Sequence, residues 1–152
     1  RTWEWVDPES DANAIVTNFN DFAMLVDGAS SVAQWNAGAL SVRNSLFDRN
    51  PGMPWQNTPP PGLADGGMAI DGFDEATALA APSLANRGLD PQLTDPLNQT
   101  SPRFTPKAGS PALSGALVPP ADDGFFDQAG GQFVGAVGPT DWTEGWTSYP
   151  EN

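Results

Sequence analysis

The sequence predicts an all-β protein in which short strands stack as successive coils of a solenoid. Three observations favour this class. The 152 residues include 16 Gly and 16 Pro, which leave little room for long helices. Short apolar runs alternate with turn residues, and one of them recurs after an interval of solenoid length. We therefore expect a single β-domain over residues 1–152 with at most one or two short helices.

Strands are expected wherever a short apolar or alternating run is bounded by Gly, Pro, Asn or Asp. Five runs meet this description: "AIVTNF" (14–19), "FAMLV" (22–26), "ALSVRNSLF" (39–47), "ALSGALV" (112–118) and "QFVGAV" (132–137).

Two segments favour a helical turn. Ser31 to Gln34 fits a capping box, and "DEATALAA" (74–81) has an acidic first turn and stops at Pro82. Between them, residues 50–67 form a long Pro/Gly stretch, which we interpret as an inserted surface loop tied down by Trp55.

The internal repeat links "VTNFND" (16–21) with "VRNSLFD" (42–48), so that Asn18 and Asn44 lie in equivalent positions. Asn side chains stacked on successive coils can satisfy one another's amide groups, as in cross-β ladders. We therefore expect an Asn ladder of Asn18 and Asn44. The alternative is that each Asn ends an unrelated strand.

Three stretches carry a family resemblance. "GLDPQLTDPLNQTSPRFTPKAGSPALSGA" (88–116) resembles the closing coil of right-handed parallel β-helix proteins of the pectin-lyase-like type, and "LSVRNSLFD" (40–48) is similar to their Asn-bearing strand. "FVGAVGPTDWTEGWTSYP" (133–150) resembles the carboxy-terminal ends of large exported bacterial members without an assigned activity. The resemblance implies the last coils and the cap of such a β-helix.

Within the second half, "GSPAL" predicts a structural corner of Gly109, Ser110 and Pro111. Gly109 can take a positive φ, Pro111 fixes the entry into the next strand, and Ser110 can bond the local backbone. A nucleophile elbow would need G-x-S-x-G and a His, and the chain has neither.

The tail, residues 133–152, is predicted to be a Trp-rich cap. Trp142, Trp146 and Tyr149 can form an apolar lid over the last coil, as terminal caps of solenoids do. Two alternatives stay open: an aromatic platform for sugar rings, and a docking surface for another protein.

Charge and composition exclude several functions. With 19 acidic against 6 basic residues the net charge is −13, which disfavours nucleic acid and an anionic membrane surface as partners. There is no Cys, so no disulfide or thiolate metal site exists. No run of apolar residues predicts membrane insertion.

No catalytic residue is predicted. Without His, the chain lacks the commonest general base and the Gly-His-Gly element of polygalacturonase-like members of the resembled family. Asp21, Asp48 or the pair Asp122 and Asp123 are candidate carboxylates, but neighbouring residues of a strand point to opposite faces. Arg43 and Arg49 do not sit in a lyase-type Arg motif.

No cofactor is predicted, and calcium is the one alternative. "DPESDAN" (7–13) starts like an EF-hand loop but departs from it at Ala12 and Asn18. Two further acidic clusters, around Asp71, Asp74 and Glu75 and around residues 122–127, fit solvated surface turns equally well.

The function predicted from these observations is a non-catalytic structural or interaction module, an accessory subunit or processed fragment of a larger assembly. Its partner would be a protein: the upstream part of its own precursor, a second copy, or a larger complex. A glycan-binding or glycan-processing β-helix module is the alternative, with a polysaccharide as ligand. The family resemblance and the acidic, thiol-free composition favour an exported protein.

Overall fold

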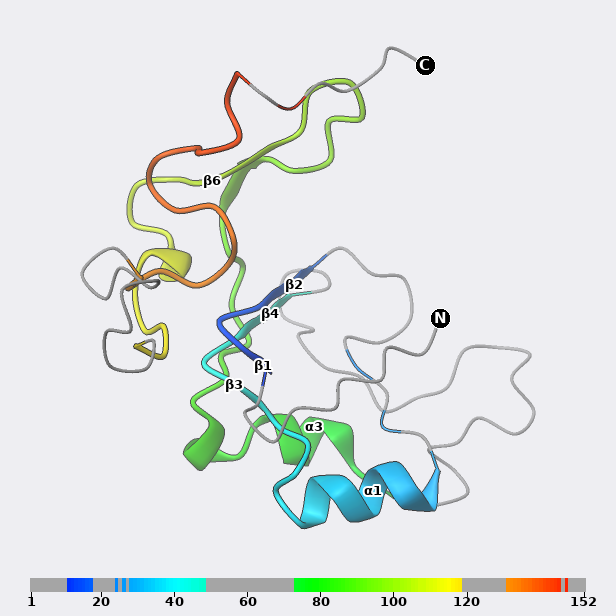
Figure 1. Cartoon of the computed structure of the whole chain (residues 1–152). Coiled ribbons are helices and arrows are strands. Elements are labelled where there is room, and N and C mark those ends of the chain that lie inside the picture. The colour runs from blue at the N-terminus through cyan, green and yellow to red at the C-terminus, as the bar shows by residue number, and fades with distance from the viewer. Residues whose placement is uncertain are drawn as a thin grey trace.

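The computed structural model describes residues 11–17, 24, 26, 28–48, 73–118, 131–145 and 147. The elements, in chain order, are β1 (Asp11–Ala12), β2 (Ile15–Thr17), α1 (Ala29–Asn36), β3 (Val42–Arg43), β4 (Leu46–Asp48), α3 (Glu75–Leu79), a 3₁₀ turn (Pro82–Leu84), β5 (Leu93–Asp95), β6 (Arg103–Pro106) and a second 3₁₀ turn (Pro111–Leu113). The parallel strands β1 to β4 lie between the two helices and the β5–β6 hairpin (Figure 1).

Two bent segments of the chain stack on each other in parallel. Asp11 pairs with Val42 and Ile15 with Leu46, 31 residues apart in both cases. The bend lies at Asn13 in one segment and at Asn44 in the other, where φ is +64° and +51°. Asn tolerates this left-handed conformation better than most residues, which is why both strands can turn at the same place.

A third segment joins the stack without forming a strand. Asn44 N–H donates to Leu84 O at 2.8 Å, and Arg87 forms a single parallel bridge with Leu46. Ala85 takes the left-handed conformation at the bend, with φ +54°. The three stacked segments, which we call levels, therefore bend at equivalent positions, and the third level has Ala where the first two have Asn.

The predicted right-handed parallel β-helix is wrong. The described residues form three separate two-stranded sheets, β1–β3, β2–β4 and the antiparallel β5–β6, and no solenoid sheet runs through them. The left-handed bends interrupt each ladder after two or three residues, and the 3₁₀ turn Pro82–Leu84 stands where a third strand would begin. Two short α-helices accompany these sheets among the described residues.

Both predicted helical turns lie in helices, but only the second begins where the sequence predicted. The helical turn predicted at 74–81 is confirmed by α3, which has the acidic Glu75 in its first turn. Asp74 caps this helix, because its Oδ1 accepts a hydrogen bond from Thr77 N–H at 2.9 Å. The capping box at Ser31 is wrong. Helix α1 begins earlier, at Ala29 after Gly28, and Ser31 is its third residue.

Residues 114–117, which we call the crossing segment, run across the three stacked bends. Arg87 Nη2 donates to Ser114 O at 2.7 Å, Asn44 Nδ2 to Gly115 O at 3.0 Å, and Asn13 Nδ2 to Leu117 O at 3.0 Å. One side chain from each level thus bonds one carbonyl of the crossing segment. This segment was predicted to be part of a strand, but its carbonyls are taken by side chains instead of a ladder.

The core lies where the stack meets the second half of the chain. Leu46, Ala112 and Val134 are completely buried against one another, and Ile15 and Ala116 pack around them. Val134 N–H donates to Ala112 O at 2.7 Å, so residues 132–137 dock onto the 3₁₀ turn instead of forming the predicted strand.

Candidate functional site

The described residues form an apolar groove of about 750 Å³. It lies between the β1–β2 segment, the β5–β6 hairpin and the loop 135–137. Its walls are Ala12, Asn13, Ala14, Ile15, Thr17, Leu93, Pro96, Leu97, Phe104, Gly135, Ala136 and Val137. None of these side chains is charged, in a chain whose net charge is −13. A concave apolar surface of this size is the usual form of a binding site.

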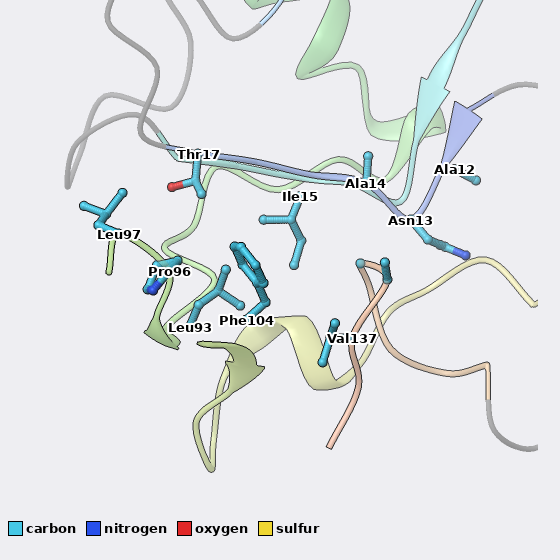
Figure 2. A pocket seen from close by; sticks show the side chains of 12 residues that line it. Ala12, Asn13, Ala14, Ile15, Thr17, Leu93, Pro96, Leu97, Phe104 and Val137 are labelled. Atoms are coloured by element: carbon cyan, nitrogen blue, oxygen red, sulfur yellow. The ribbon is translucent and has the colours of Figure 1, made fainter. Parts of the chain in front are cut away.

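Side chains from both sides meet inside the groove. Figure 2 shows Ile15 of β2 pointing toward Phe104 of β6, with Leu93 and Val137 beside them. Phe104 is 41% exposed and Leu97, at the Thr17 end, is 67% exposed. Covering large apolar side chains that have this much contact with water lowers the free energy, so these side chains favour binding of a partner.

The free edge of β2 borders the groove. Leu46 N–H donates to Ala14 O at 2.8 Å, so β2 uses alternate residues to bond β4. The N–H and C=O groups of Ile15 and Thr17 therefore face the opposite edge, and no described residue bonds them there. Exposed strand edges of this kind accept an added strand.

Gly135 fits closely against this edge at the other end of the groove. Its N–H donates to Asn13 O at 2.6 Å, and its φ is +100°. A Cβ at this position would lie 2.7 Å from Ile15 Cδ1, so only Gly lets the loop approach the strand without displacing Ile15.

A smaller polar pocket of about 290 Å³ continues the groove past Thr17, Leu93 and Pro96. It adds Asp90, Pro91, Gln92 and Lys107 to the lining. Asp90 Oδ1 accepts from Gln92 N–H at 2.7 Å, and Asp90 makes no ion pair with any described residue. The second oxygen of this carboxylate is therefore available to a ligand.

Asp48 lies next to this end of the groove, at the end of β4 and opposite Thr17 in the ladder. It is 8% exposed. Burial raises the pKa of the Asp48 carboxyl above its ordinary value, and the negative charge of Asp90 raises it further. Asp48 lines neither pocket, so its raised pKa is a property of a buried charge beside the site.

We expect Asp48→Asn to stabilise the protein at neutral pH. The folded state holds the Asp48 proton more tightly than the unfolded state. Ionisation of Asp48 therefore lowers the free energy of unfolding as the pH rises from 3.8, the ordinary pKa of Asp, through the raised pKa. Asn should raise the melting temperature at pH 7 by about 2–4 °C, the effect of about 1 kcal/mol in a domain of this size. Near pH 3 the difference should vanish.

Thermal unfolding monitored by circular dichroism at both pH values measures this. Glu144→Gln, which removes one charge at an exposed position, controls for the change in net charge. A gain of equal size at pH 3 and pH 7 would contradict the explanation.

The predicted corner supports the hairpin side of the site. Gly109 has φ +83°, and the buried Ser110 hydroxyl donates to Pro91 O at 2.6 Å and accepts from Ala112 N–H at 3.0 Å. Pro111 starts a 3₁₀ turn and not the expected strand. The three residues thus tie the segment that carries Asp90 to the core.

Of the four aromatic residues predicted for the cap and the loop, Trp142 is among the described residues. Trp142 is 54% exposed, and its Nε1 donates to O of the groove residue Ala136 at 2.7 Å. Trp55, Trp146 and Tyr149 lie outside the described residues, as does the predicted loop 50–67. The role of the tail as a cap therefore stays a prediction.

The predicted Asn ladder involves Asn18, which lies outside the described residues. Asn44 has Asn13 at the equivalent position of the next level, and the amides of both donate to the crossing segment. The ladder of Asn18 and Asn44 stays a prediction. Asn13 was not part of that prediction, and in the structure it lines the groove.

The acidic residues considered as calcium ligands have other roles where they are described. Asp74 caps α3, and the buried Glu75 accepts from Val26 N–H through Oε1 at 3.1 Å. Asn13 uses both amide atoms on Leu117. Within the described part of the chain, no group of three His, Cys, Asp or Glu residues could hold a metal ion.

The described helices include none long and apolar enough to cross a membrane. Comparisons of the chain with family models, with curated proteins and with solved structures found no match. Nothing in these comparisons identifies the family that residues 88–116 and 133–150 resemble. The proposed function is therefore argued from the geometry of the site alone.

Most groove residues were missed by the sequence reasoning because they are ordinary apolar residues from distant segments. One signal was available: "NAIV" (13–16) and "NSLF" (44–47) share Asn, a small residue and two large apolar residues. This alignment gives the observed interval of 31 residues and would have placed Ile15 next to Leu46.

Proposed function

We propose that this protein is a non-catalytic interaction module that holds a segment of another protein in the apolar groove. The observation that carries the proposal is the groove itself. It combines exposed Leu97 and Phe104 with the free edge of β2, and it presents no charged side chain. A partner segment would cover the apolar side chains and bond the open backbone groups of Ile15 and Thr17.

The partner is a different protein in this proposal, with the present chain as an accessory subunit of an exported assembly. A second copy would bring another charge of −13 to the interface, and like charges disfavour association. The groove side chains offer no pair of carboxylates for glycoside hydrolysis. These points favour binding of a partner over self-association or glycan processing.

Glycan binding is a second candidate because of Trp142. Its ring is exposed, and its Nε1 fixes it to Ala136 at the rim of the groove. Sugar rings stack on such surfaces. The groove beside Trp142 nevertheless offers few polar side chains to a sugar's hydroxyl groups, since among the groove residues only Asn13 and Thr17 carry one, and Asn13 is already bonded to Leu117.

Site-specific photo-crosslinking in the natural host tests the proposal. A benzophenone amino acid replaces Leu97 in the groove, or Leu89 as the matched control, which is 49% exposed and lies outside the groove. We expect a discrete adduct with one other protein from position 97 and none from position 89.

Three outcomes would contradict the proposal. Equal adducts from both positions would show nonspecific contact, and no adduct from position 97 would leave the groove without a partner. An adduct of carbohydrate at position 97 would favour the glycan alternative. Thermal unfolding of each labelled protein establishes that it is folded before the comparison is made.

A further inference from the structure

The two ends of the groove differ in polarity, and this difference indicates which kind of segment would fit it. From Asn13 to Thr17 its walls are apolar, and beyond Thr17 it opens into the polar pocket that contains Asp90. Leu97 and Pro96 lie where the two meet, beside Thr17 (Figure 2). A segment lying along β2 would thus have apolar residues on one side of this point and a polar residue on the other.

Charge decides which polar residue fits. Asp90 contributes a carboxylate that is not ion-paired with any described residue, and Asp48 adds a buried negative charge close by. The repulsion between the two carboxylates, which contributes to the raised pKa of Asp48, is relieved by a cation placed at Asp90. Lys107 lines the same pocket but forms no ion pair with Asp90.

The charge of the whole chain acts in the same direction. A net charge of −13 attracts a basic partner from a distance and raises its association rate, whereas the uncharged groove selects the apolar residues that follow. The charged end and the apolar walls therefore recognise different parts of one ligand.

We propose that the groove binds an extended protein segment in which apolar residues at alternate positions are followed by a Lys or Arg that pairs with Asp90 in the polar pocket. This inference rests on the proposed function and adds the chemistry of the partner. Alternation follows from the strand geometry, because only every second side chain of a segment beside β2 can point into the groove.

A displayed random dodecapeptide library is the probe. It is selected on the wild-type chain, and the enriched peptides are then measured individually on variants. We expect enriched sequences with two or more apolar residues at alternate positions and a Lys or Arg at a fixed distance from them. Leu97→Gln should weaken their binding, and Leu89→Gln should not.

Asp90→Asn tests the cation. Asn keeps an oxygen that can accept from Gln92 N–H, so the local turn is retained while the charge is removed. Because Asp90 is exposed, we expect about a threefold to fivefold loss of affinity for peptides with the basic residue and less than a twofold change when that residue is replaced by Gln. Glu144→Gln, at an exposed position outside both pockets, should change neither.

The outcomes separate this inference from the proposed function. Peptides that depend on Leu97 but carry no basic residue, or that bind Asp90→Asn unchanged, would overturn the inference and leave the groove as a docking site. Equal losses for Asp90→Asn and Glu144→Gln would reduce the effect to overall charge and also overturn it. Failure to enrich any peptide that depends on Leu97 would overturn both.

Discussion

Leu46→Ala is expected to lower the free energy of unfolding by about 3 kcal/mol. Leu46 is fully buried at the centre of the stack, where it bonds Ala14, pairs with Ile15 and forms a bridge with Arg87. Its side chain packs on Ala112 and Val134, which join the stack to the second half of the chain. The substitution removes apolar contacts and leaves a cavity that the surrounding backbone cannot close.

Chemical denaturation followed by tryptophan fluorescence measures this change, with Leu89→Ala as the control. Leu89 is 49% exposed, so its truncation should cost less than 1 kcal/mol. Similar losses for the two variants would show that the stack is not the core of the protein.

The double substitution Leu97→Gln and Phe104→Gln is expected to weaken partner binding about 30-fold. Both side chains line the groove and are exposed in the free protein, so their remaining surface is buried when a partner binds. Each contributes on the order of 1 kcal/mol through this burial, and the two together account for the expected change. Leu97 is mostly exposed, so its replacement should change the melting temperature little, whereas replacement of the partly covered Phe104 should lower it.

Calorimetric titration with the crosslinked partner measures the loss, and Leu97→Gln alone provides a variant with the smaller effect on folding. Leu89→Gln is the matched control outside the groove. An affinity unchanged by the double substitution would show that the partner binds elsewhere.

Local chemistry made some features predictable. The acidic start of residues 74–81 predicted a helical turn, and in the structure Asp74 caps α3 by accepting from Thr77 N–H. The same kind of reasoning placed Ser31 at a helix start and was wrong. Gly28 and Ala29 open α1 without a side-chain cap, so no short-range signal marked the true beginning.

The arrangement in space was harder to predict because it depends on the interval between the stacked segments. The alignment of Asn18 with Asn44 gave an interval of 26 residues, whereas Asn13 stands opposite Asn44 at 31. The third level has Ala85 at the bend, so a search for a repeated Asn could not find it. Parallel pairing therefore exists without the regular coils that a β-helix requires.

The hairpin and the groove were not predicted for a related reason. β5 and β6 are short, carry Pro and polar residues, and have an irregular register between Leu93 and Asp95, so they show no clear alternation. The groove then forms from three segments that are distant in sequence and share no motif. Neither the location nor the apolar character of the groove could therefore be predicted before the fold showed which residues line it.

The native mass of the particle that contains this chain tests the central claim most directly. The protein is purified without denaturant from its natural host, measured by light scattering, and every chain in it is identified by intact mass spectrometry. We predict a stoichiometric complex of this chain with a different protein. A single chain of 16.0 kDa as the whole particle, with no second polypeptide, would contradict the account.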